Sequence, residues 1–91
     1  MISAALAVLE SEEQRNELSE IYEQNISNFY NIAFQHLHNK HDAEDAIQDA
    51  FLSVAGNPDT FFAVPPKDRI KYIKAIIRNT SCKIWNKKHV T

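Results

Sequence analysis

Cationic side chains and one aromatic side chain recur at helical spacing in the C-terminal third of the chain. With about 3.6 residues per helical turn, positions three, four or seven apart share one side of a helix. Lysine and arginine neutralise backbone phosphates, and an indole ring can stack on a base, so the pattern indicates a nucleic-acid surface. The alternative left open is a solvated basic face whose tryptophan belongs partly to the core. The residues in this pattern are Lys67, Lys71, Lys74, Arg78 and Trp85.

Two further groups of side chains could contact a base. Tyr72 and Asn79 flank the basic row, where a ring could stack on an unpaired base and an amide could bond base edges. Phe61 and Phe62 fall in the proline-containing stretch 56–67, which is expected to be a loop. They have two interpretations: they fill the core, or they help to form a pocket for an extruded base.

A second polar row precedes that stretch. Asp45, Gln48, Asp49 and Leu52 stand at i, i+3, i+4 and i+7, on the side of a helix opposite the apolar positions from 47 to 51. A leucine exposed among carboxylates and an amide is a plausible anchor for a partner helix. The alternative is an ordinary solvated face with one exposed leucine, which is common.

Other residue clusters do not favour catalysis or metal binding. His36 and His38 point to different sides of a helix and no second Glu-x-x-His pair completes a bundle site, so we expect no metal. A polar turn with His38 near Asp42 is expected instead. Cys82 is the only cysteine and has lysines rather than a base around it, so nucleophilic catalysis is not expected. The chain is predicted to be a non-enzymatic protein without a cofactor.

Charge is divided unevenly along the sequence. Residues 1–65 carry 2 basic and 11 acidic side chains, whereas residues 66–91 carry 8 basic and 1 acidic, although the net charge of the chain is only −2. Such an asymmetry favours a cationic C-terminal surface for a polyanion. A single cysteine fits a reducing cytoplasm. The apolar start at 2–9 is too short to span a membrane, and we expect a short helix there and no membrane partner.

Helical periodicity organises the whole chain. With 91 residues, one Gly and three Pro, it is expected to form a single all-α domain, a compact bundle of three to four helices. Ser11 and Gln14 have the spacing of a capping box, and Asp42 has the position of a second N-cap. The predicted helices span 12–38, 42–55 and 68–88, with the loop 56–67 before the last.

At this point the residues resemble a known family. The segments are Ile21-Tyr-Glu-Gln, Phe29-Tyr-Asn-Ile-Ala-Phe34, Asp42-Ala-Glu-Asp-Ala-Ile-Gln-Asp-Ala-Phe-Leu52 and Tyr72-Ile-Lys-Ala-Ile-Ile-Arg-Asn79. In order and spacing they are similar to region 2 of the extracytoplasmic-function (ECF) sigma factors of bacterial RNA polymerase, over about residues 11–88.

The resemblance implies a specific function, the initiation of transcription at alternative promoters. In that family this domain docks on the clamp helices of the largest polymerase subunit, and it recognises and melts the promoter element near the transcription start. Here docking would fall to the row of Asp45, Gln48, Asp49 and Leu52. Contacts with the unpaired non-template strand of promoter DNA would fall to the loop and the last helix. The residues expected to contact DNA are Asn57, Phe61, Phe62, Lys67, Lys71, Tyr72, Lys74, Arg78, Asn79 and Trp85.

The chain also departs from the family pattern. Lys83 stands where a carboxylate is usual, which makes the end of the last helix more cationic. The second promoter-reading domain of the family, region 4, is expected to be absent from these 91 residues. The alternative hypothesis is therefore a sigma-like interaction module that binds polymerase or an anti-sigma factor without touching DNA.

Overall fold

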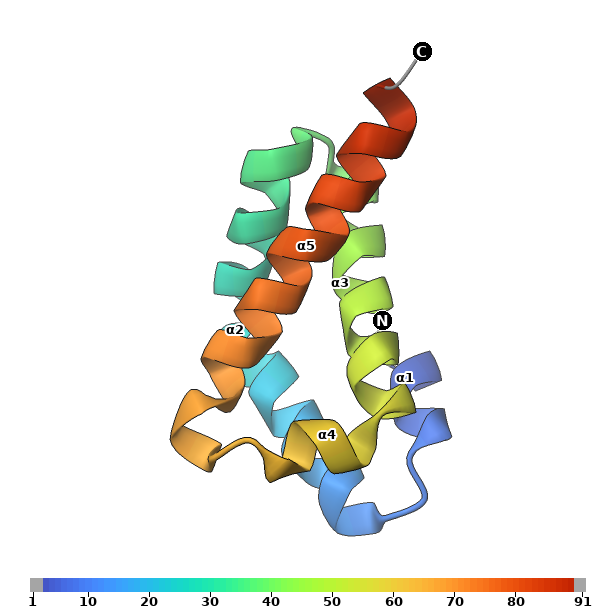
Figure 1. Ribbon diagram of the computed structural model, residues 1–91, viewed down its shortest axis with the longest axis vertical. Coiled ribbons are helices and arrows are strands. Elements are labelled where there is room, and N and C mark those ends of the chain that lie inside the picture. The colour runs from blue at the N-terminus through green and yellow to red at the C-terminus, as the bar shows by residue number, and fades with distance from the viewer. Residues whose placement is uncertain (1–2, 90–91) are drawn as a thin grey trace.

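The computed structural model describes residues 3–89, and within them every regular element is helical (Figure 1). The predicted all-α class is confirmed. The predicted helices at 12–38, 42–55 and 68–88 are present, and each end lies within two residues of its predicted position. The elements are α1 (Ser3–Val8), α2 (Glu12–Leu37), α3 (Lys40–Gly56), α4 (Pro58–Ala63), the short 3₁₀ helix η1 (Pro66–Asp68) and α5 (Arg69–His89).

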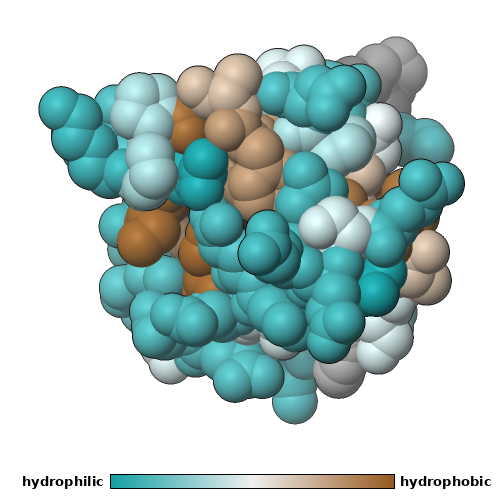
Figure 2. Space-filling view, turned by 90° about the horizontal axis from the view of Figure 1, so that it is seen from below, coloured by the Kyte–Doolittle hydropathy of each residue, from teal (hydrophilic) through white to brown (hydrophobic). Residues whose placement is uncertain are grey.

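The three long helices α2, α3 and α5 pack against one another and enclose the core. In Figure 1, α5 crosses in front of α2 and α3, while α4 lies across the lower end of the bundle. The expected short N-terminal helix is also present, since α1 packs on α3 and buries Ala5, and Leu9 directly after it is buried as well. Seen from the lower end, the surface is mainly hydrophilic with smaller apolar areas between the polar side chains (Figure 2).

Large apolar side chains from each long helix meet in the centre of the bundle. Leu18 and Phe29 of α2, Phe51 of α3 and Ile73 of α5 are each 0% exposed. The centres of the Phe51 and Phe29 rings lie 5.8 Å apart, within the usual range for aromatic pairs, and the two rings are tilted relative to each other. Burying side chains of this size stabilises the fold by about 1.5–3 kcal/mol each. The helical spacing of these apolar residues is therefore what fixes the inner face of each helix.

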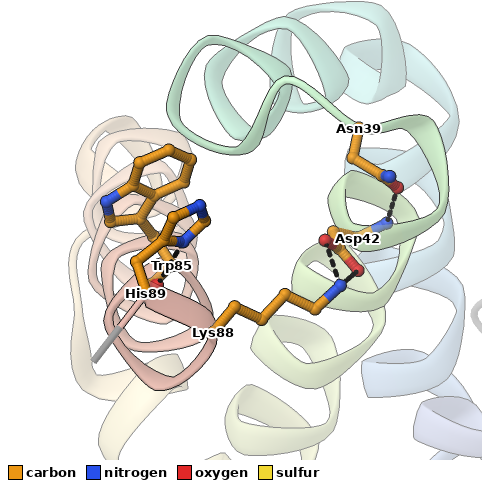
Figure 3. Close-up of polar contacts among 5 residues, drawn as sticks. All are labelled: Asn39, Asp42, Trp85, Lys88 and His89. Atoms are coloured by element: carbon orange, nitrogen blue, oxygen red, sulfur yellow. Dashed lines mark hydrogen bonds and ion pairs between the residues drawn. The ribbon is translucent and has the colours of Figure 1, made fainter. Parts of the chain in front are cut away.

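Helix ends are set by polar side chains, and one of the two predicted caps is wrong. Ser11 caps α2 as expected, since its hydroxyl accepts a hydrogen bond from the Gln14 backbone N–H at 3.3 Å. The N-cap of α3 is Asn39 rather than Asp42: the Asn39 side chain accepts from the Asp42 N–H at 2.9 Å (Figure 3). His38 ends α2 in the left-handed region at φ 53°, which reverses the chain so tightly that α3 begins at once.

The stretch 56–67 is not a simple loop. It contains α4 and most of η1, each with a proline at its first position, Pro58 and Pro66. Proline suits a first helical position because its missing N–H would have no helical partner there. The prolines that predicted an irregular loop therefore start short helices instead. Within residues 3–89, none of the helices combines the length and hydropathy that crossing a membrane requires.

Candidate functional site

The outer face of α3 carries the predicted docking residues. Asp45, Gln48 and Asp49 are exposed, and Leu52 is 38% exposed, one of the few large apolar side chains at the surface of the described residues. Within residues 3–89, none of the three polar side chains makes a hydrogen bond or ion pair with the rest of the domain. The row faces outward because the residues on the opposite side of α3, such as Phe51, are buried against α2. It is therefore free to bind a partner.

The predicted basic row runs along the outer side of η1 and α5. Lys67, Lys71, Arg78 and Asn79 are exposed, and Lys74 is partly buried. The opposite side of α5 is apolar, with Ile73 and Ile77 both 0% exposed. The row thus forms one cationic strip on the surface, as the spacing predicts.

Trp85, at the far end of that row, is neither part of the core nor fully open. Its side chain is 37% exposed. The His89 ring stacks on it, with ring centroids 3.5 Å apart, and the His38 ring meets it edge-on at 6.2 Å. Figure 3 shows Trp85 and His89 lying face to face. A base that stacks on this face of the indole has to displace His89.

The two phenylalanines of α4 have different environments. Phe61 is 1% exposed, so the core interpretation holds for it and a direct contact of its ring with DNA does not fit this structure. Phe62 is half-buried and packs edge-on against Phe61 at 4.9 Å, while half-buried Tyr72 lies 5.8 Å from Phe61. Asn57 is exposed, and its amide donates to the Ser53 carbonyl at 3.2 Å. Phe61 therefore supports the surface on which Phe62 and Tyr72 lie.

Arg69 organises the same region, and the sequence reasoning missed it. Its guanidinium donates hydrogen bonds to the carbonyls of Val64 and Phe62, both at 2.9 Å, and to the Glu17 carboxylate on α2. It also lies 5.2 Å from the centre of the Phe62 ring. In the sequence, Arg69 is marked only by its position three residues after a Pro-Pro pair. Its partner Glu17 lies 52 residues away, so no local pattern connects the two. Arg69 thus fastens the segment from α4 to η1 onto the bundle.

At the other end of the bundle, an ion pair joins α5 to α3. The Lys88 ammonium donates to both carboxylate oxygens of Asp42, at 2.8 and 2.6 Å, and Asp42 is only 8% exposed (Figure 3). The carboxylate is therefore occupied by Lys88, and the His38 ring packs against Trp85 instead of forming the polar turn expected with Asp42. Among residues 3–89, no three His, Cys, Asp or Glu side chains are grouped in a way that could hold a metal ion.

Comparison with known proteins identifies the family. The family model described as sigma-70 region 2 matches residues 21–89, which run from the first half of α2 to the end of α5. Neither curated proteins nor solved structures give a match. Sigma-70 region 2 is a non-catalytic domain of the factors that act with core RNA polymerase in transcription initiation. The matched span includes both outer faces described above, and the chain therefore belongs to the sigma-70 region 2 family.

Proposed function

We propose that this chain is the region 2 domain of an alternative sigma factor of the ECF type, working in the bacterial cytoplasm without a cofactor. It docks on the clamp helices of core RNA polymerase through α3, and it recognises and melts the promoter element near the transcription start through the segment 57–68 and α5. The observation that carries the proposal is that an uncompensated acidic row and a cationic strip occupy different outer faces of one bundle.

The α3 row has the chemistry of a protein-docking surface. Asp45 and Asp49 supply charges that no basic side chain of the described domain neutralises, so they favour a basic partner. Leu52 offers apolar area beside them, and an apolar anchor within a polar surround is the usual arrangement of a binding hot spot.

The α5 side has the chemistry of a single-strand surface. Lys71, Lys74 and Arg78 attract phosphates, while Phe62 and Tyr72 present partly exposed rings next to them. Capturing an extruded base costs only a few kcal/mol of lost stacking and pairing, which contacts in a pocket can offset. Melting by capture of a non-template base therefore requires no energy source beyond binding.

Capture of core RNA polymerase tests the docking half of the proposal. The native domain should bind the core enzyme, and Asp49→Ala should weaken binding without changing the melting temperature, because the exposed Asp49 side chain makes no hydrogen bond or ion pair within the described domain. The triple alanine variant of Asp45, Gln48 and Asp49 should abolish capture. Glu10→Ala is the matched control, since Glu10 is an exposed carboxylate outside α3. Equal binding by Asp49→Ala and the control would refute the docking face.

Salt-dependent binding of a single-stranded promoter oligonucleotide tests the DNA half. Each lost phosphate contact reduces the slope of log K against log salt by about 0.7 for single strands, so replacing Lys74 and Arg78 by alanine should reduce it by about 1.4. An unchanged slope would show that the strip does not touch the backbone. If the native domain captures polymerase but no oligonucleotide at physiological salt, the interaction module without DNA binding is the correct interpretation, with an anti-sigma factor as a further candidate partner.

A further inference from the structure

A groove of about 390 Å³ lies between α2 and α3, beside the docking row. Its apolar lining comes from both helices, and the polar residues in its lining include exposed Ser27, Glu44 and Gln48. A cavity of this size is within the range of sites that hold a side chain or small ligand. The lining residues used below are Tyr22, Ile26 and Ser27 of α2 with Glu44, Ile47 and Gln48 of α3.

The groove is negatively charged at its edge. Burial, and then the charge of Glu44, raise the pKa of the Tyr22 phenol above its ordinary value of 10.0. Tyr22 and Glu44 line the same groove, so the phenol and the carboxylate are neighbouring polar groups there. Glu44 is exposed and makes no ion pair within residues 3–89. Among the described residues that line the groove, Glu44 is the charged one and none is basic.

The groove is continuous with the docking row. Glu44, Gln48 and Leu52 stand at i, i+4 and i+8 on α3, so they form one line along the helix. Gln48 belongs both to the groove and to the row, and Leu52 continues the line at 38% exposure. A helix laid along the docking row therefore passes the opening of the groove.

We infer that the groove receives an arginine side chain from the polymerase helix that docks on α3. This inference rests on the proposed function. The aliphatic stem of an arginine would pack on Ile26 and Ile47, and its guanidinium would reach Glu44 at the edge. The same planar group can stack on the Tyr22 ring.

Charge and shape select this occupant over others. An acidic side chain would be repelled by Glu44, and the acidic balance of residues 1–65 adds to that repulsion. A purely apolar side chain would remove water from the Glu44 carboxylate without supplying a partner, which is costly. Lysine would satisfy the charge but not the planar, two-pronged contact with a carboxylate.

Two variants and one matched control test the inference in the complete domain bound to core RNA polymerase. Ser27→Trp fills the groove from its exposed edge, and Asn28→Trp adds the same ring at an exposed neighbour that does not line the groove. Glu44→Gln removes the charge and keeps the shape. A fluorophore on Cys82, the single, exposed cysteine, reports binding by anisotropy.

Ser27→Trp should weaken binding about tenfold or more, as expected when a buried anchor is displaced, while Asn28→Trp should leave affinity unchanged. Glu44→Gln should weaken it about two- to fivefold, and less so at high salt. Equal affinities of Ser27→Trp and Asn28→Trp, or no effect of Glu44→Gln, would overturn the inference. The proposed function would still stand in that case if Asp49→Ala weakens binding to polymerase. If the native domain does not bind polymerase at all, the proposed function and this inference both fail.

Discussion

Arg69 provides the most direct test of how the fold positions the segment 57–68, which we propose to contact DNA. We consider Arg69→Met, which keeps most of the aliphatic stem and removes the guanidinium. The side chain of Arg69 is 13% exposed, so its hydrogen bonds are little screened by water. The substitution removes the donors to the carbonyls of Val64 and Phe62 and to the carboxylate of Glu17.

The expected loss of stability follows from these three contacts. Each bond from the guanidinium to a carbonyl contributes about 1–1.5 kcal/mol, at the lower limit for a charged donor, because neither carbonyl belongs to a fully buried residue. The Glu17 side chain is 41% exposed, so that ion pair adds at most about 1 kcal/mol. The sum of about 2–4 kcal/mol is a large part of the total stability of a domain of this size. The melting temperature should fall by about 10–20 °C.

Thermal unfolding followed by circular dichroism measures this loss. Arg78→Met is the matched control, because Arg78 is an exposed arginine on the same helix without an intramolecular polar contact among the described residues. Hydrogen exchange should accelerate in α4 and η1 more than in α2, since Arg69 fastens that segment locally. A melting temperature equal to that of Arg78→Met, or exchange that is unchanged in α4, would refute the role assigned to Arg69.

Three other substitutions have defined outcomes. Ser81→Ala should raise the melting temperature, with a gain in stability of about 1 kcal/mol, because the buried Ser81 hydroxyl has no hydrogen-bond partner among residues 3–89. Asn39→Ala should cost about 1 kcal/mol in urea unfolding through loss of the α3 cap. The raised pKa of Tyr22 means that the unfolded state ionises first, so stability is lost as the pH rises above the ordinary value of 10.0. Tyr22→Phe should therefore reduce the decline in stability measured above pH 10.0.

Much of this fold is predictable because its signals are local. The cap at Ser11 depends on a residue three positions away, and the inner face of α5 depends on isoleucines such as Ile73 and Ile77 recurring at helical intervals. The exposure of Asp45, Asp49 and Leu52 follows from the same periodicity, since a row opposite an apolar stripe faces solvent. The candidate faces could thus be located from spacing alone.

What could not be predicted depends on contacts between distant residues or on competing local signals. Asp42 has the residue type of a cap, but its carboxylate pairs with Lys88, 46 positions away, and Asn39 takes the cap. Prolines suit both loops and first helical turns, so Pro58 could not by itself distinguish the two. The burial of Phe61 depends on how α4 lies across the bundle, which no periodicity within six residues specifies.

The arrangement of the two faces is what the proposed function requires of a domain that would link polymerase and promoter DNA. Phe51 of α3 and Ile73 and Ile77 of α5 lie in the same core, so the outer faces of these helices are held at a fixed orientation by packing. Within the described residues, the connection between α3 and α5 contains α4 and η1, and Arg69 fastens it to the bundle. A partner bound on α3 therefore defines where the cationic strip lies. Single-stranded DNA bound on α5 would be positioned relative to polymerase by the rigidity of the bundle rather than by a conformational change.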